Sequence, residues 1–194
     1  HQGTIPALWD GVITSPLCTR LVNDYEVSIS TVEHLMASLV GCGIHNARIE
    51  VTGQEVPIMD GSASVFVRAF LQAGLRRQNA KVHALRVLKP VEVRRGDAMA
   101  RISPYKTLLI EFDIEFEDAA IGAQSKTLNM SNGSFVRELS SSRTFCRQAD
   151  VDHMQANGLA LGGSRGRMRL YLMAIAPFRR AGCAMRMSRC ATRC

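Results

Sequence analysis

From about residue 30, apolar residues begin to recur every three or four positions, the spacing of an α-helix. Ser30 stands three residues before Glu33, which is the spacing of a capping box at a helix N-terminus. Gly41 and Gly43 lie further on, and glycine is common where helices end. The pattern therefore predicts a helix that Ser30 opens and the two glycines close. Between them, apolar side chains recur every three or four positions, as along a buried helix stripe: Leu35, Met36, Leu39 and Val40.

A second helix is predicted after a turn at residues 57–62, whose sequence is Pro-Ile-Met-Asp-Gly-Ser. Its apolar positions run up to Gly74: Val65, Phe66, Ala69, Phe70 and Leu71. Between the two helices, residues 47–51 alternate and include isoleucine and valine, so they are predicted to form a short strand. Residues 76–81 are polar and have the character of a linker.

Beyond the linker, apolar positions alternate with a period of two, which is typical of β-strands. Strands are predicted at 84–93 and 98–103, joined by a hairpin turn at 94–97. Residues 108–116 alternate most strongly, so one face of this strand is expected to be buried. Two further helices are predicted: 132–141 and 151–156.

The order of these elements places the chain in the α+β class. Two layered α/β-sandwich units are expected, at residues 1–78 and 82–164, the second of them incomplete. The chain begins at His1 without a methionine, so further strands of the first unit are expected to precede it in the complete protein. Composition changes abruptly near Ser164, and residues 165–194 form an aberrant tail rich in arginine and cysteine.

Composition excludes two broad classes of protein. The 194 residues are 46% hydrophobic and 21% charged, whereas disordered chains combine low hydrophobicity with high charge. No apolar run reaches the roughly 18 residues of a membrane-spanning helix, and no basic-then-apolar leader is present. The six cysteines lack zinc-finger spacing, and those before the tail stand among apolar neighbours as free thiols would. A cytoplasmic protein is therefore expected.

The net charge of +7 is confined to the tail. Residues 165–194 contain eight arginines and no acidic residue, so residues 1–164 carry a net charge of −1. One alternative is therefore a non-catalytic protein that binds nucleic acid or an anionic membrane surface through the tail. The tail lacks the amphipathic period and interleaved aromatic residues that such binding uses, and we expect no nucleic-acid partner. Salt-dependent retention that is lost on deleting the tail would favour this alternative.

Glu33 and His34 are the best candidates for chemistry. A neutral imidazole is a good zinc ligand, and a neighbouring carboxylate can take a proton from metal-bound water. The alternative is that Glu33 only caps its helix and His34 is an ordinary residue of the first turn. Thr144 could donate its hydroxyl to a developing oxyanion, or could cap a helix. Asp60-Gly61-Ser62 is interpreted as a structural turn, and residues 1–164 provide no complete metal site.

Several of these stretches together resemble one bacterial enzyme family. Residues 30–37 have the sequence Ser-Thr-Val-Glu-His-Leu-Met-Ala, and residues 56–63 have Val-Pro-Ile-Met-Asp-Gly-Ser-Ala. Shorter matching stretches complete the pattern: 41–44, 49–51, 142–145 and 158–164. On these motifs, from about Leu17 to Ser164, the chain is identified as a member of the UDP-3-O-acyl-N-acetylglucosamine deacetylases, the zinc amidases of lipid A biosynthesis.

The resemblance implies a fold, a cofactor and a reaction. Two α+β domains are expected to enclose an active site in which two histidines, one aspartate and a water hold Zn²⁺. The zinc-bound water attacks the acetamide of UDP-3-O-acyl-N-acetylglucosamine. By position, His34 matches the first zinc ligand, Glu33 the general base and Thr144 the oxyanion donor. A monomer is expected.

The resemblance also assigns residues to substrate binding. One group matches positions around the passage for the acyl chain: Leu17, Cys18, Phe145, Val151 and Ala160. Glu115 and Phe116 match positions near the uridine pocket.

After Ser164 the sequence departs from the family. The expected run Gly-Leu-Arg-Tyr-x-Asp-Glu-x-Val-Arg-His-Lys, which supplies the second zinc histidine, is missing. When the codons of residues 181–193 are read in a shifted frame, they permit this run in the correct order. We therefore expect the tail to be a frame-shifted version of the zinc-ligand segment, and expect the chain as written to have negligible deacetylase activity and weak zinc affinity. The DNA sequence across codons 160–194 tests this expectation.

Overall fold

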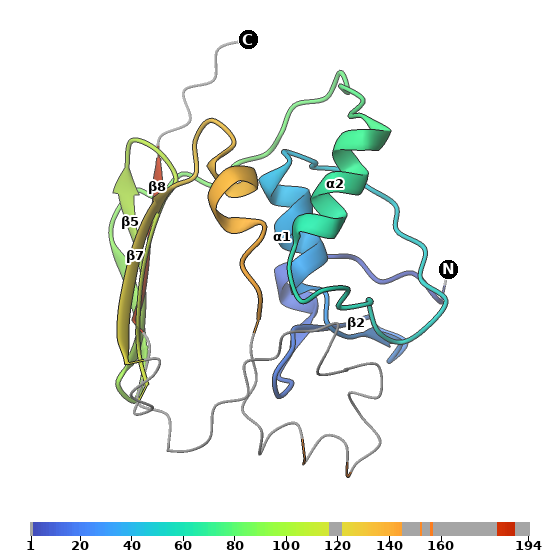
Figure 1. Cartoon of the computed structure of the whole chain (residues 1–194), viewed down its shortest axis with the longest axis horizontal. Coiled ribbons are helices and arrows are strands. Elements are labelled where there is room, and N and C mark those ends of the chain that lie inside the picture. The colour runs from blue at the N-terminus through green and yellow to red at the C-terminus, as the bar shows by residue number, and fades with distance from the viewer. Residues whose placement is uncertain (1, 117–121, 145–151, 153–155, 157–181, 189–194) are drawn as a thin grey trace. The chain divides into compact units, whose positions relative to one another are not determined.

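The computed structural model describes residues 2–116, 122–144, 152 and 156, together with the backbone of residues 182–188. These residues belong to two compact units (Figure 1). The first unit comprises His1–Gln78 and Phe135–Thr144, and the second comprises Asn79–Ser134 and Phe145–Cys194. The chain combines helices with mostly antiparallel sheets, which confirms the predicted α+β class.

The first unit contains a three-stranded antiparallel sheet in the order β1-β2-β3. Its elements are the 3-10 helix η1 (Trp9–Gly11) and the strands β1 (Val12–Ile13), β2 (Arg20–Val22) and β3 (Ser28–Ile29). Leu21 of the middle strand pairs with Val12 and Ile29, and its side chain is buried. The sequence did not predict β1 and β2, because two or three residues are too few to show alternation.

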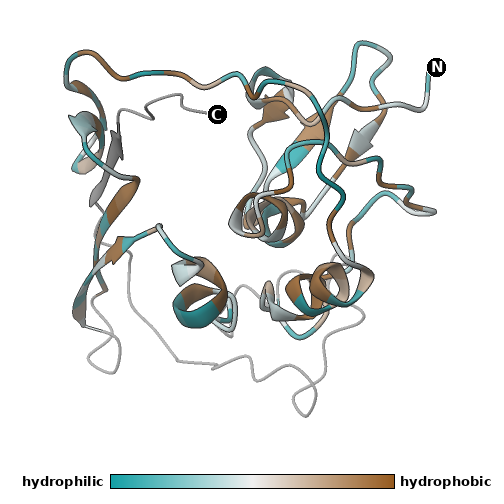
Figure 2. Ribbon diagram, turned by 90° about the horizontal axis from the view of Figure 1, so that it is seen from above, coloured by the Kyte–Doolittle hydropathy of each residue, from teal (hydrophilic) through white to brown (hydrophobic). Residues whose placement is uncertain are grey.

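Both predicted helices of the first unit are present, as α1 (Glu33–Gly41) and α2 (Ser64–Ala73). Each carries hydrophobic residues (Figure 2). Val40, expected on the buried stripe of α1, is 66% exposed, because it lies about 100° around the helix from Leu39, beyond the edge of the core. Met36 packs partly against the core. The buried residues of the core cluster come from β2, from α1 and the residue before it, and from the connection to α2: Leu21, Val32, Leu35, Leu39 and Val56.

The predicted capping box at Ser30 is wrong. Ser30 pairs with the chain after α1: its N–H donates to Gln54 O at 2.9 Å, and its carbonyl accepts from Val56 N at 3.0 Å. This backbone pairing keeps Ser30 extended, so α1 begins only at Glu33, and its N-cap residue Val32 makes no side-chain capping bond. The Glu33 carboxylate is engaged elsewhere, as described below.

The predicted strand at residues 47–51 is also wrong. Ile49 is 45% exposed and Val51 is 40% exposed, and these residues have no strand assignment. The charged side chains of the alternation, Arg48 and Glu50, form a surface ion pair at 3.1 Å. Alternation produces a strand only where a neighbouring strand offers hydrogen bonds, and none pairs with this stretch among the residues that the structure describes.

A short helical turn replaces the longer helix predicted at 132–141. This element, η2 (Phe135–Leu139), is a π-helix whose closing bond runs from Ser140 N to Phe135 O at 2.8 Å. It lies beside α1 in the first unit (Figure 1). The Phe135 ring is buried directly over Gly41, so closely that a Cβ at Gly41 would overlap it. Only glycine at this point of α1 allows the contact.

The second unit is built on a five-stranded sheet in the order β4-β5-β8-β6-β7. Strand β8 is parallel to β5 and antiparallel to β6, so a stretch of the tail lies between two strands of the predicted second domain. The sheet consists of β4 (Val91–Arg95), β5 (Ala98–Tyr105), β6 (Leu109–Glu115), β7 (Ala123–Asn129) and β8 (Gly182–Ser188).

The hairpin turn between β4 and β5 is present, with Gly96 at φ 61°. The first strand is shorter than predicted, because it begins at Val91 rather than at residue 84. On β6 the predicted buried face is incomplete: Ile110 and Ile114 are half-buried, but Phe112 is 42% exposed. The predicted helix at 151–156 lies largely outside the described residues.

The contact between Gly41 and Phe135 yields a stability prediction. Replacing glycine by alanine within a helix ordinarily stabilises a protein by about 0.5–1 kcal/mol. Here the added methyl group displaces the ring, and overpacking typically costs about 1–3 kcal/mol. We expect Gly41→Ala to lower the free energy of unfolding measured by urea denaturation.

The matched control is Gly53→Ala, because nothing lies within 4 Å of a Cβ at Gly53. It should change the free energy of unfolding by less than about 0.5 kcal/mol. Removing the ring as well, in Gly41→Ala combined with Phe135→Ala, should give a smaller loss than the two single losses added together. A Gly41→Ala protein as stable as the parent would contradict the packing described.

Candidate functional site

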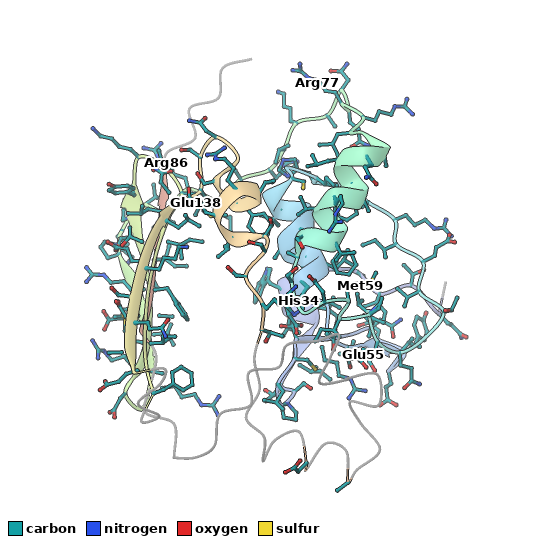
Figure 3. All side chains as sticks on the ribbon, viewed as in Figure 1. His34, Glu55, Met59, Arg77, Arg86 and Glu138 are labelled. Carbon is teal, nitrogen blue, oxygen red and sulfur yellow. The ribbon has the colours of Figure 1, made fainter. Side chains whose placement is uncertain are left out.

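The chain enters α1 through a strained residue. Thr31 has φ 60°, a conformation that β-branched residues rarely adopt, and it is buried. Its Oγ1 donates a 2.7 Å hydrogen bond to Glu55 Oε1, and the neighbouring Ser30 pairs with the backbone at Glu55. The turn at Thr31 directs the chain from β3 into α1, so that Glu33 and His34 form the first turn of the helix. Figure 3 shows His34 on this helix, with Glu55 on the connection to α2.

Glu33 is held by the backbone of another segment. Its Oε2 accepts a 2.9 Å hydrogen bond from Thr19 N, just before β2. The carboxylate therefore does not cap its own helix, which removes the capping role that the sequence had left open for Glu33. One oxygen is fixed in direction, and the side chain is half-buried beside β2.

His34 is tied to the start of α2 through Ser38. The Ser38 hydroxyl is completely buried and lies 2.6 Å from His34 O and 3.2 Å from Ala63 O. One proton thus serves two carbonyl groups, one in each helix-forming segment. The first turn of α1 and the residue preceding α2 are therefore held at a fixed separation by a single small side chain.

The turn before α2 is organised by Asp60. Its Oδ1 accepts hydrogen bonds from Ser62 N at 3.1 Å and Ser62 Oγ at 2.7 Å. The Ser62 side chain is 1% exposed, and its Oγ also accepts from Ser64 N at 3.2 Å. Met59, immediately before this turn, has φ 56°. The structural turn interpreted from the sequence is present, and Asp60 uses only one of its two oxygens to form it.

The second Asp60 oxygen binds a residue far along the chain. Arg143 Nη2 donates to Asp60 Oδ2 at 3.2 Å, and the backbones of Arg143 and Ser62 form an isolated antiparallel bridge. Thr144 N donates to Gly61 O at 2.9 Å. Thr144 therefore lies in the same unit as Glu33 and His34, next to the turn that Ser38 links to α1.

The pKa of Asp60 reflects these contacts. Partial burial alone would raise the pKa of the carboxyl group. The hydrogen bonds from Ser62 and the charge and hydrogen bond of Arg143 outweigh this effect and lower the pKa below its usual value. The ionised carboxylate is thus the form that holds the turn and Arg143 together.

The other residues assigned from the resemblance are less closely connected. Leu17 is 64% exposed with φ 62°, and Cys18 is half-buried with its Sγ 3.3 Å from Ser15 Oγ. Glu115 ends β6 as an exposed residue, and Phe116 N donates to Gly122 O at 3.0 Å, both in the second unit. Three further assigned residues lie outside the described part of the chain: Phe145, Val151 and Ala160.

The described residues do not complete a metal site. Among them, no three histidine, cysteine, aspartate or glutamate side chains come together in a group that could hold a metal ion. His34 therefore belongs to no such group in this part of the chain. In the same residues, no helix has the length and apolar character needed to cross a membrane.

The lowered pKa of Asp60 predicts a pH-dependent stability. A carboxyl group with a depressed pKa in the folded state stabilises the fold fully above its unfolded pKa, near 3.9, and this contribution is lost as the pH falls through the folded value. We expect the free energy of unfolding to fall less steeply in Asp60→Asn than in the parent between about pH 6 and pH 3. Denaturant titrations across this range measure the difference. Asp24→Asn, which removes an exposed carboxylate, should follow the parent, and identical slopes for all three proteins would refute the prediction.

Comparison with known proteins agrees with the motifs. Residues 1–169 match the family model of LpxC, UDP-3-O-acyl N-acetylglycosamine deacetylase. A UDP-3-O-acyl-N-acetylglucosamine deacetylase of Shewanella frigidimarina is 45% identical over 163 residues, covering 83% of this chain and 53% of the relative. Proteins of the same name from Sodalis glossinidius and Pasteurella multocida are 47% identical over 161 residues and 45% identical over 163 residues. They cover 82% and 83% of this chain, and 53% of each relative.

The matched region contains the residues singled out above: Glu33, His34, Asp60 and Thr144. The chain spans about half the length of the curated relatives it matches. The match to the family model ends at residue 169 of this chain, close to the abrupt change in composition at Ser164. With a family match over most of its length, this chain belongs to the LpxC family of UDP-3-O-acyl N-acetylglycosamine deacetylases.

Proposed function

We propose that this chain carries the Glu33, His34 and Thr144 portion of the active site of a UDP-3-O-acyl-N-acetylglucosamine deacetylase. The reaction is hydrolysis of the acetamide group, which gives a free amine and acetate in lipid A biosynthesis. The relatives that cover most of this chain bear that name. The hydrogen bond from Thr144 N to Gly61 O is the main support for this proposal, because it holds Thr144 in the unit that contains Glu33 and His34.

Glu33 is proposed as the general base. A carboxylate that takes a proton from the attacking water must lie in a fixed orientation toward it. The hydrogen bond from Thr19 N holds Glu33 Oε2 at 2.9 Å. Because the carboxylate is planar, this bond also restricts the direction of the other oxygen, Oε1. The attack places a negative charge on the former carbonyl oxygen of the acetamide.

Thr144 is proposed to stabilise that charge. A hydroxyl that donates to the developing oxyanion acts best when its backbone is held before the reaction begins. The bond to Gly61 O and the Asp60–Arg143 ion pair together hold the Thr144 backbone. Loss of one such donor commonly lowers turnover by about 10²–10³-fold.

Zinc dependence does not follow from the described residues. A catalytic zinc site requires three protein ligands, and no group of three candidate side chains comes together among the residues described. No step in this mechanism is therefore assigned to zinc. We propose instead that His34 is one member of a ligand set whose other members this chain does not supply in the family's order, since the expected run after Ser164 is missing.

The roles of these residues are testable in a chimeric enzyme. Residues 1–164 of this chain replace the matching residues of the Shewanella frigidimarina relative, which is 45% identical over the aligned region. We expect the chimera to release acetate from UDP-3-O-acyl-N-acetylglucosamine. Glu33→Gln and Thr144→Val should each lower kcat by about 10²–10³-fold.

The control for the chimera is Glu50→Ala, because Glu50 lies in an exposed ion pair with Arg48. This variant should keep the parental kcat. A folded chimera without activity, or one in which Glu33→Gln keeps full activity, would overturn the proposed function.

The chain by itself is expected to behave differently. Because the described residues hold no group of three candidate ligands, we expect the purified chain to retain far less than one equivalent of zinc after dialysis and to show negligible acetate release. Elemental analysis and a mass-spectrometric acetate assay measure the two quantities. Stoichiometric zinc together with turnover would contradict the expectation.

A further inference from the structure

The residues from Phe135 to Thr144 cross the first unit and are attached to it at both ends. At one end the buried Phe135 ring lies over Gly41 of α1. At the other end Thr144 N donates to Gly61 O, in the turn before α2. We call residues 135–144 the strap. Its far end holds Thr144, so whatever fixes that end also fixes the proposed oxyanion donor.

Asp60 joins the strap to the turn because each of its two carboxylate oxygens binds a different segment. Oδ1 accepts hydrogen bonds from Ser62 N and Ser62 Oγ, so the carboxylate is fixed relative to the turn. Oδ2 accepts from Arg143 Nη2 at 3.2 Å. Because Ser62 is 1% exposed, the first set of contacts is sheltered from water and anchors the second.

The Asp60–Arg143 contact differs in kind from an ordinary surface ion pair. The two side chains are 31% and 46% exposed, and an isolated pair of this exposure adds little to global stability. Here the same two segments are also joined by the Ser62–Arg143 backbone bridge, of which the Thr144–Gly61 hydrogen bond is a part. The contact therefore acts mainly on local geometry at Thr144 and contributes only a small part of the free energy of unfolding.

We infer that Asp60 is a positioning residue for Thr144: its carboxylate clamps Arg143 to the turn before α2 and keeps the Thr144 backbone in place. Arg143 is the partner through which it acts, and neither side chain takes part in bond making. The catalytic meaning of this role rests on the proposed function. The clamping itself is a property of the folded chain.

Hydrogen exchange of the full chain measures the clamp directly. The Thr144 amide is protected by its bond to Gly61 O, whereas the Ile44 amide, which donates to Leu39 O, reports on the end of α1. We expect Asp60→Ala to speed exchange of Thr144 about tenfold, the effect of losing one charge-assisted hydrogen bond. Exchange of Ile44 should change less than about twofold.

Two further variants make the result specific. Glu92→Gln removes a carboxylate from an exposed ion pair with Arg94 in the second unit, and should leave Thr144 exchange unchanged. The pair of substitutions Asp60→Arg and Arg143→Asp restores opposite charges, and should recover part of the lost protection. An Asp60→Ala protein in which Thr144 and Ile44 exchange faster by the same factor would overturn the inference, as would unchanged Thr144 exchange.

Kinetics of the chimera separate this inference from the proposed function. Asp60→Ala should lower kcat there while the KM stays within about twofold, because a displaced donor weakens the transition state more than substrate binding. Faster Thr144 exchange with an unchanged kcat would overturn the positioning role and leave the proposed function standing. Full activity of Glu33→Gln would overturn the proposed function and leave the exchange result to decide the clamp.

Discussion

The close approach of other segments to helix α1 is the constraint on which the first unit depends. At Ser38 the helix meets the start of α2, and the completely buried hydroxyl donates to the carbonyl group of Ala63. At Gly41 it meets the ring of Phe135 without any side chain of its own. Leu35 and Leu39, on the core side, supply the apolar area that stabilises the helix. A helix of nine residues thus serves as the common support for elements from three parts of the chain.

Three residues next to the candidate site have a positive φ, a backbone conformation that raises the free energy of residues with a Cβ. Leu17, Thr31 and Met59 all have φ near 60°, and they directly precede Cys18, the N-cap residue of α1 and Asp60. Side chains with a Cβ adopt this conformation at a cost of about 1–3 kcal/mol, and such residues cluster at functional sites. At Thr31 the cost is offset by the partly buried hydrogen bond to Glu55. The strain and the hydrogen bonds together fix where Glu33 and Asp60 lie.

The sequence predicted what local patterns determine and missed what distant contacts determine. Helices α1 and α2 and the hairpin at Gly96 follow from spacing and turn residues within a few positions. The capping box failed because Ser30 pairs with a segment beyond α1, and the strand at 47–51 failed because it has no partner strand. The motifs single out Glu33, His34 and Thr144 as candidates, whose roles stay predictions, and no pattern in the sequence reveals that Asp60 binds Arg143.

The attachment of residues 135–144 to α1 and α2 has a consequence for how the protein acquires its structure during translation. The first unit is interrupted in the sequence by residues 79–134, which belong to the second unit. When the nascent chain has left the ribosome only as far as Gln78, neither Phe135 nor Arg143, the partner of Asp60, has yet been synthesised. Closing so long an intervening loop costs conformational entropy, although the cost grows only slowly with loop length. The amino-terminal core can collapse early, but its final ordering must wait for residues made much later.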